Sequence, residues 1–438
     1  MYDLAILNGD VYLNGEFVNT NVYIKNGRVA LIGEELMRAA EVYDAYNKLV
    51  LPGFIDPHVH FSLNTEKGMS ADTFFSGSIS AAFGGITTFI DFLDPIRQDR
   101  ELDPYFENRM NLASDSVVDY SFHSCLGNFR GDVSKVLKKI KNFGIPSVKV
   151  FTTYSQSDRM CQDHVIDEIM SFSRKQKILL MVHAENDSLI RKEQDIEVKD
   201  LYESRNYLCE ATEVVKLAQM NEYHDGNLYI VHTGCGEIIQ ILREKYCKLV
   251  SKRILLESAP HYFIFDNNVY NMENGFLFTM TPPLKPKKQR SLLWENFDAI
   301  SVIGTDHCPF KVAEKKQKYV SEIPMGVGGV EHSFEIMYNI LGKKVIDKFT
   351  INPAKIFGLF PQKGTIFPSS DADIVIFDPN KEHTIKESHS GSDYDIYKGI
   401  TVKGAVECTI CRGKFVVKNN IFMGKRGNGQ FVKRNEYE

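Results

Sequence analysis

Two histidines stand two residues apart at the end of an apolar segment, in the motif PGFIDPHVH of residues 52–60. Because side chains at positions i and i+2 of a strand share one face, the imidazoles of His58 and His60 can bind one metal ion together. An HxH pair in a strand is more often structural, so the pair alone is only suggestive. Three further apolar segments support the metal interpretation, since each also ends in a histidine or an acid. These residues are His183, His232 and Asp306.

A lysine lies inside another apolar segment, Lys149 in the run SVKVF of residues 147–151. Four histidines and one aspartate can hold two divalent cations such as zinc, but this set lacks a ligand that bridges them. An ammonium group would be repelled by both ions and is costly to bury. A carbamate, formed from the neutral amine and carbon dioxide, would instead offer one oxygen to each ion. Without the neighbouring ligands, the default interpretation of Lys149 would be a plain buried or snorkelling lysine.

Eight apolar segments alternate with amphipathic stretches between about Leu51 and Pro361. This alternation predicts parallel βα units, and eight of them favour an α/β fold with a closed (β/α)8 TIM-like barrel. A doubly wound open sheet is the competing fold. In a barrel the carboxyl ends of the strands meet on one face, so the candidate ligands would converge there. The predicted strands are 50–60, 86–93, 118–125, 147–154, 178–183, 228–232, 254–258 and 299–306.

Both ends of the chain have a different pattern, with short alternating segments separated by Asn-Gly turns such as Asn8-Gly9 and Asn26-Gly27. Such turns predict antiparallel hairpins. We expect residues 1–50 and 362–438 to form one small β-sandwich, with the barrel of residues 51–361 inserted between them. The basic, glycine-rich tail of residues 424–434 is expected to be a surface or subunit-contact arm.

The composition is that of an ordinary globular protein, with 438 residues, 52 Lys and Arg against 57 Asp and Glu, and a formal net charge of -5. This charge gives no reason to expect nucleic acid as a partner. The sequence contains no run of 18 apolar residues and no basic segment leading into an apolar one at its start, so we expect no membrane span and a cytoplasmic protein.

The eight cysteines do not suggest a metal site or a thiol-based site. The one CxxC motif, Cys408 to Cys411, has no second pair to complete a four-cysteine zinc site. Residues three apart on a strand point to opposite faces, so these two thiols are not expected to converge.

Taken together and in order, the motifs resemble the cyclic amidohydrolases, and within them the dihydropyrimidinase and hydantoinase family. The resemblance spans nearly the whole chain. Its motifs are PGFIDPHVH, the lysine of the fourth predicted strand, VHAEN, IVHTG and GTDHCPF, together with GGITT before the second strand, TPPL, IPMGVGG, NPAKIFGL and the re-entry segments GTI and DADIV.

The resemblance implies a dinuclear metal centre, in which N6-carboxylysine at Lys149 bridges two divalent ions, zinc being the expected metal. The residues matching His58, His60 and Asp306 would hold one ion, and those matching His183 and His232 the other. The implied reaction opens the ring of a cyclic amide by attack of metal-bound hydroxide and needs no redox cofactor.

Two further roles follow from the resemblance. Asp306 would accept the proton of the attacking water and pass it to the departing nitrogen, and Tyr154 would stabilise the oxyanion. The family's substrates are dihydropyrimidines and 5-substituted hydantoins. Thr281 and Met325 occupy the substrate-binding positions. Relatives often carry Ser at the position of Thr281 and usually carry Asn at the position of Met325. Loops 62–72 and 153–161 correspond to the walls of the substituent pocket.

Alternatives remain open within and beyond this class. Allantoinase or another cyclic-ureide amidohydrolase is one alternative, and dihydroorotase would need cationic groups for a substrate carboxylate, of which the sequence gives no clear match. Scaffold relatives without activity lose metal ligands, whereas all six positions are filled here. The family is usually tetrameric, which implies a homotetramer. His307 is expected to point away from the site, and His123 to be a core histidine that could otherwise line the pocket.

Overall fold

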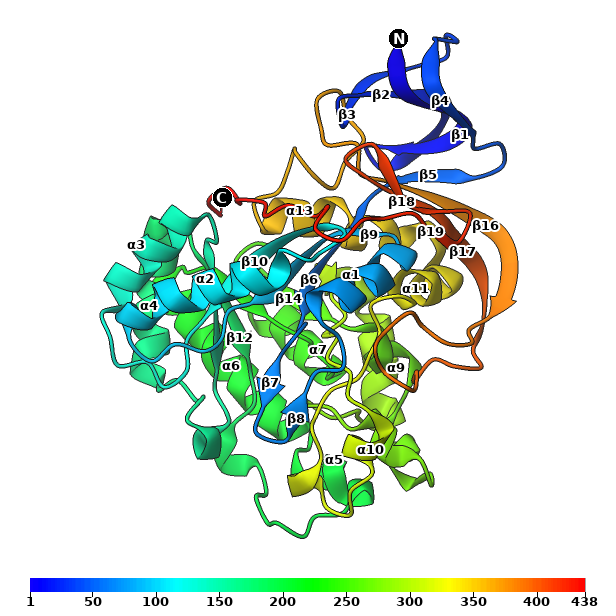
Figure 1. Cartoon of the computed structure of the whole chain (residues 1–438). Coiled ribbons are helices and arrows are strands. Elements are labelled where there is room, and N and C mark those ends of the chain that lie inside the picture. Colours follow the sequence, from blue (N-terminus) through cyan, green and yellow to red (C-terminus); the bar gives the residue numbers. More distant parts are fainter. Residues whose placement is uncertain (438) are drawn as a thin grey trace.

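The computed structural model describes residues 1–437, and its larger part is a nearly closed barrel of eight parallel strands (Figure 1). The strands follow one another in chain order, and a bridge between Val59 and His307 connects the first strand to the segment after the last. The barrel strands are β6 (Phe54–Val59), β9 (Ile86–Phe92), β10 (Asp119–Cys125), β11 (Ser147–Phe151), β12 (Leu179–His183), β13 (Leu228–Ile230), β14 (Ile254–Ser258) and β15 (Val302–Ile303).

All eight predicted strands are present, with one correction. The predicted strand 50–60 is two strands, because Leu49–Pro52 forms β5 in a different sheet and the chain enters the barrel only at Phe54. Gly53 separates them at a point of close approach, where a Cβ atom would lie 2.2 Å from Thr87 Oγ1. Only glycine fits at this junction without displacing its neighbours.

Helices surround the barrel and bury their apolar faces against it. In α3, Val136, Leu137 and Ile140 are buried; Asp132 caps the first turn by accepting from the Lys135 N–H, and Gly144 ends the helix in a left-handed conformation. The helices are α1 (Phe74–Phe83), α2 (Leu102–Ala113), α3 (Val133–Phe143), α4 (Asp163–Gln176), α5 (Leu201–Ser204), α6 (Tyr207–His224), α7 (Gly236–Lys245), α8 (Pro260–Ile264), α9 (Lys287–Glu295), α10 (Val312–Lys315), α11 (Ser333–Leu341), α12 (Ile346–Phe349) and α13 (Ile351–Ile356).

The inside of the barrel is filled by side chains rather than open. Ile90 of β9, Met181 of β12 and Tyr229 of β13 belong to one buried cluster with Ala354 and Phe357, which close the amino end of the barrel. This packed layer leaves space only at the carboxyl ends of the strands, where barrel enzymes place their chemistry.

Both ends of the chain join in one mixed nine-stranded sheet, seen above and to the right of the barrel in Figure 1. The two halves meet where β5 pairs antiparallel with β16, with Leu51 opposite Val375. Residues of both halves, such as Ile6 and Ile376, share one core, as expected for a small sandwich. The strands are β1 (Tyr2–Leu13), β2 (Glu16–Lys25), β3 (Arg28–Gly33), β4 (Ala39–Asp44), β5 (Leu49–Pro52), β16 (Ile374–Thr384), β17 (Thr401–Cys411), β18 (Lys414–Lys418) and β19 (Ile421–Phe422). The division into residues 1–50, 51–361 and 362–438 stays a prediction.

The predicted surface arm holds for part of the tail, since residues 425–427, 430 and 433 are exposed, whereas Val432 and Arg434 are buried. Residues after β19 run back across the amino end of the barrel, where Tyr120 N donates to Gln430 O. Arg434 is buried and donates to Ser121 Oγ, Phe122 O and other acceptors there. A charged tail residue is stable in this position because the amino ends of the strands present unpaired oxygen acceptors to it.

The two thiols of the CxxC motif do not converge, as predicted, because Cys408 belongs to the core of the mixed sheet and Cys411 to the larger core of the barrel. In the part of the chain that the structure describes, no helix is long and apolar enough to cross a membrane.

Candidate dinuclear metal site

The carboxyl ends of the barrel strands bring all six predicted ligands to one cavity of about 420 Å³. Three lie within strands, namely His58 in β6, Lys149 in β11 and His183 at the end of β12. The other three follow a strand directly or within three residues, and they are His60, His232 and Asp306. The short strand β7 (Asn64–Thr65) and its partner β8 (Gly68–Met69) form a hairpin beside this cavity.

One group of ligands gathers around a single carboxylate oxygen. Asp306 Oδ1 lies 3.2 Å from His58 Nε2 and 3.1 Å from His60 Nε2. The rings of His183 and His232 form the adjacent pair, with centroids 4.6 Å apart, and the His58 and His232 centroids are 5.5 Å apart. The division into a triad and a pair is the one that the resemblance implies for two ions.

Buried carboxylates orient two of these imidazoles. Glu257 Oε1 accepts from His58 Nδ1 at 2.6 Å, and Glu185 Oε2 accepts from His183 Nε2 at 2.7 Å. Each contact fixes the tautomer and leaves the other ring nitrogen available to a metal. Glu257 also accepts from the Tyr229 hydroxyl and from the His232 N–H, so it connects three strands below the site.

Three of the ligand histidines, His60, His183 and His232, are held in the neutral form that binds metals. Burial lowers the pKa of His60 to about 4 and also lowers the pKa values of His183 and His232. Burial would raise the pKa of Asp306, but the neighbouring imidazoles hold it well below its usual range, so the carboxylate stays ionised. His232 Nδ1 is buried and has no hydrogen-bond partner in residues 1–437. Neutral imidazoles, an ionised aspartate and this unpartnered nitrogen fit divalent cations.

Lys149 lies within this donor set and has no partner of its own in the described structure. Its side chain is buried, and its Nζ lies over the rings of Phe92 and Phe151, 5.2 and 5.5 Å from their centroids. No carboxylate of residues 1–437 forms an ion pair with it. Burial lowers the pKa of Lys149 to about 8, which raises the fraction of neutral amine near neutral pH.

Three residues of the site adopt left-handed backbone conformations that cost energy outside glycine. The φ angles are +38° at His232, +50° at Asp306 and +71° at Tyr154. Such strain persists only where the surrounding structure imposes it, and it concentrates at functional sites. Here it turns side chains that follow β11, β13 and β15 back over the barrel mouth.

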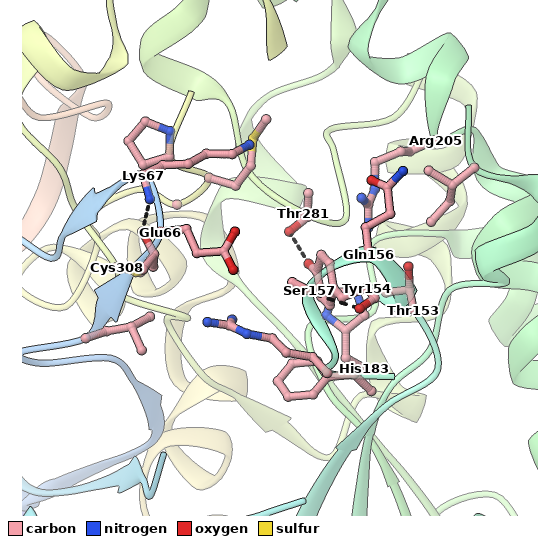
Figure 2. Close-up of a pocket in the computed structure, with 18 of the residues that line it drawn as sticks. Glu66, Lys67, Thr153, Tyr154, Gln156, Ser157, His183, Arg205, Thr281 and Cys308 are labelled. Atoms are coloured by element: carbon pink, nitrogen blue, oxygen red, sulfur yellow. Dashed lines mark hydrogen bonds between the residues drawn. The ribbon is translucent and has the colours of Figure 1, made fainter. Parts of the chain in front are cut away.

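The three predicted substrate contacts, Tyr154, Thr281 and Met325, all line the cavity. The hydroxyls of Tyr154 and Thr281 are hydrogen bonded at 2.6 Å on its wall (Figure 2). Both predicted loops contribute to the lining, among others through Glu66 and Lys67 and through Gln156 and Ser157.

The two predictions about other histidines agree with the structure. His307 points away from the ligands, since its Nε2 lies 2.9 Å from Asp72 Oδ2 and its Nδ1 accepts from the Gly329 N–H. His123 is a buried core histidine that contacts Ser147 Oγ and Pro57 O.

Sequence reasoning missed Glu185, Arg205 and Glu257. Glu257 lies within an apolar strand, the same signal that identified Lys149, and Glu185 follows His183 by two residues, the spacing that relates His58 to His60. Arg205 pairs with Glu185 and lies between two helices, and no local pattern marks it.

Comparisons with known proteins agree with this geometry. The sequence model described as "Amidohydrolase family" matches residues 49–416. The D-hydantoinase of Geobacillus stearothermophilus is 33% identical, the alignment covering 99% of this chain and 96% of that protein. The D-phenylhydantoinase of Escherichia coli (strain K12) is 30% identical, with 99% and 98% covered.

Solved structures extend the likeness to three dimensions. A crystal structure of D-hydantoinase superposes with a TM-score of 0.93 at 31% identity, with all of both chains covered. The dihydropyrimidinase of Brevibacillus agri NCHU1002 also gives 0.93, at 29% identity and with full coverage of both chains. The fold prediction is therefore confirmed. A family match over most of the sequence and relatives of at least 30% identity along its whole length show that this chain belongs to the amidohydrolase family, in its hydantoinase and dihydropyrimidinase branch.

Proposed function

We propose that this protein is a dinuclear metal hydrolase that opens the ring of cyclic amides, namely dihydropyrimidines and 5-substituted hydantoins. The observation that carries the proposal is the convergence of four imidazoles, one aspartate and one buried lysine on a single cavity at the barrel mouth. The relatives named above as hydantoinases and a dihydropyrimidinase support this substrate class.

Two divalent ions, which we propose to be zinc, would activate a water molecule and polarise the substrate carbonyl when bound. One would be held by His58, His60 and Asp306, and the other by His183 and His232. We propose that Lys149 becomes N6-carboxylysine, since its amine can take up carbon dioxide, release a proton and present two carboxylate oxygens. Its place in the wall of the cavity that both the triad and the pair line supports this bridging role.

The remaining steps belong to the chain's own groups. Asp306 accepts the proton from the attacking water and returns it to the ring nitrogen as the C–N bond breaks. The Tyr154 hydroxyl keeps its proton, because burial raises its pKa, and donates to the developing oxyanion. Thr281 orients that hydroxyl through the 2.6 Å contact, and Met325 shapes the wall of the ring pocket.

The assembly and the cellular location are proposals too. We propose a homotetramer on the basis of the resemblance, and a sedimentation experiment that finds a stable monomer would remove it. We propose a cytoplasmic location, supported by eight cysteines that are all unpaired thiols. We propose no nucleic-acid or membrane partner.

Metal analysis coupled to a ring-opening assay tests the function. Protein purified with excess divalent metal should contain about two ions per subunit and should open dihydrouracil and phenylhydantoin. A metal content well below this value would contradict the dinuclear site. Turnover of allantoin alone would shift the assignment to an allantoinase.

A further inference from the structure

Two cationic side chains of the cavity, Arg159 and Lys67, have no acidic partner. Neither forms an ion pair within residues 1–437, and the guanidinium of Arg159 has no hydrogen-bond partner there either; Lys67 Nζ has one weak contact, 3.5 Å from Ile323 O. Apart from Lys149 of the candidate metal site, the other cations of the cavity are each paired with an acid. These pairs are Arg109 with Asp91, Arg191 with Glu193, Lys192 with Asp187 and Arg205 with Glu185.

The acid adjacent in sequence is held away from Arg159. Asp158 adopts a left-handed conformation with φ +55°. Its carboxylate accepts from Arg97 Nε at 2.6 Å and from the Asn128 amide, and lies 3.8 Å from Arg130. None of these four residues lines the cavity, so the guanidinium of Arg159 has no counter-ion there.

The backbone at Arg159 is fixed against the barrel. Its N–H donates to Tyr154 O at 3.3 Å, which closes the loop, and the ideal Cβ position at Gly127 lies 3.4 Å from its Cα. Arg159 is thus held next to the residue whose hydroxyl we assign to the reacting carbonyl. A substrate ring seated on Tyr154 brings its exocyclic substituent within reach of the loops that carry Arg159 and Lys67.

One unpaired carboxylate, Glu66, opposes these two charges. Figure 2 shows it on the same loop as Lys67, directed toward the middle of the cavity. With the paired residues neutralised, Arg159 and Lys67 against Glu66 leave one net positive charge in the substituent pocket. A guanidinium that faces a cavity without a partner is suited to a carboxylate, which it can bind through two parallel hydrogen bonds.

From this arrangement we infer that the preferred substrates are cyclic ureides whose ring substituent carries a carboxylate, with Arg159 as the specificity-determining residue and Lys67 as a second positive charge. The inference rests on the proposed function and deepens it. It also supplies the cationic group that a carboxylate-bearing ring requires and that the sequence did not reveal.

The test compares two isosteric ligands, 5-(2-carboxyethyl)hydantoin and its neutral amide, 5-(2-carbamoylethyl)hydantoin. Both Kd, measured by calorimetry on the metal-loaded protein, and kcat/KM for ring opening are determined. The wild type should favour the acid by about tenfold or more, the size expected for a charge-assisted contact. Arg159→Gln should reduce this ratio to near one, and Arg159→Lys should retain most of it.

Two more variants complete the comparison. Glu66→Gln removes the opposing charge and should raise the preference for the acid a few-fold. Arg130→Gln removes an equal charge outside the cavity, and it should leave the ratio unchanged. Unaltered metal content in each variant excludes misfolding as the cause of a changed ratio.

The two proposals fail in different ways. Ring opening without a preference for the acid, or with a preference that survives in Arg159→Gln, overturns the inference and leaves the proposed function standing. A Kd ratio that depends on Arg159 in a protein that opens neither ring supports the inference on anionic ligands and overturns the proposed function.

Discussion

Two buried clusters in this protein contain metal-ligand side chains around a lysine, one at each end of the barrel. At the carboxyl end, His58, His60 and Asp306 lie together, and Lys149 forms no ion pair with a carboxylate in the described structure. Burial therefore lowers the pKa of this lysine to about 8. The cluster therefore holds donor groups that are not paired with its lysine.

At the amino end, Asp119, Asp373 and Cys411 are equally close together. Here Lys363 lies among them, with its Nζ 2.5 Å from Asp119, 2.7 Å from Asp373 and 3.1 Å from Asp371. These carboxylates raise its pKa well above the ordinary value. The lysine takes the place that a metal ion could otherwise occupy.

The difference teaches that a set of ligand residues does not define a metal site. What decides is whether the fold supplies an internal cation that pairs with the acids. Both clusters border a cavity, since Asp119, Asp371 and Cys411 line one at the amino end, but at that end Lys363 pairs with the carboxylates. We expect Lys149 at the carboxyl end to be needed for chemistry and Lys363 at the amino end to be needed for stability.

The largest effect is expected from Lys149→Ala. Loss of the bridging group should lower kcat/KM by about 10³-fold or more, because the loss of a metal is worth several kcal/mol in the transition state. Metal analysis should show fewer bound ions, while the melting temperature changes little. Added acetate, which supplies two carboxylate oxygens, should restore part of the activity. Full activity in this variant would contradict the carbamate.

Lys363→Met should lower the stability of the fold and leave the metal content unchanged. Removing one partner of a buried ion network typically costs about 3–5 kcal/mol, because carboxylates remain buried without a counter-ion. Chemical denaturation measures the loss. Lys398→Met serves as the control, since it breaks only the exposed pair with Glu387, and exposed pairs contribute little. Equal effects of the two variants would show that the network at the amino end is not important for stability.

Glu257→Gln should lower the metal affinity of the cluster at the carboxyl end without abolishing metal binding. Glutamine keeps one acceptor oxygen in place of two, and the Oε1 atom that it would replace accepts from both His58 and His232, so His58 loses its fixed orientation only in part. Changes of this kind cost about 10–100-fold in metal affinity or activity. Titration with a chelator, followed by residual activity, gives the affinity. An unchanged chelator midpoint would show that Glu257 does not orient His58.

The smallest effect concerns pH. Burial raises the pKa of Asp373 even with Lys363 present. In Lys363→Met the folded protein should therefore bind protons that the unfolded chain, with its ordinary carboxyl pKa, has released. Stability then rises as the pH falls toward the raised pKa, so the deficit of the variant should shrink by about 1–2 kcal/mol between pH 7 and pH 5. An equal deficit at both pH values would show that Arg412, which contacts Asp119, has replaced the lysine.

The sequence predicted the barrel and the cluster at its carboxyl end because the patterns that indicate them are local. Each ligand ends an apolar strand or lies within one, and parallel strands align their carboxyl ends, as His58, His183 and Asp306 illustrate. The cluster around Lys363 at the amino end could not be predicted. Asp119, Lys363 and Cys411 come from three distant segments, and their contact depends on how the tail and the mixed sheet pack against the barrel.

Arg159 illustrates a different limit of prediction from the sequence. Its position on the loop after β11 could be read from the sequence, but its lack of a partner could not, because the neighbouring Asp158 is the obvious one. Only the left-handed backbone at Asp158 and the contact with Arg97 separate the two charges.

The pairing of Leu51 with Val375 also has a consequence for how the protein is made. On the ribosome, strands β1 to β5 emerge first, but the edge of β5 that faces β16 cannot find its partner until more than 320 further residues have been added. The whole barrel is synthesised during this delay. Contacts of such long sequence separation form late and slowly. The unpaired edge of β5 therefore has to avoid pairing with other chains until β16 has been synthesised.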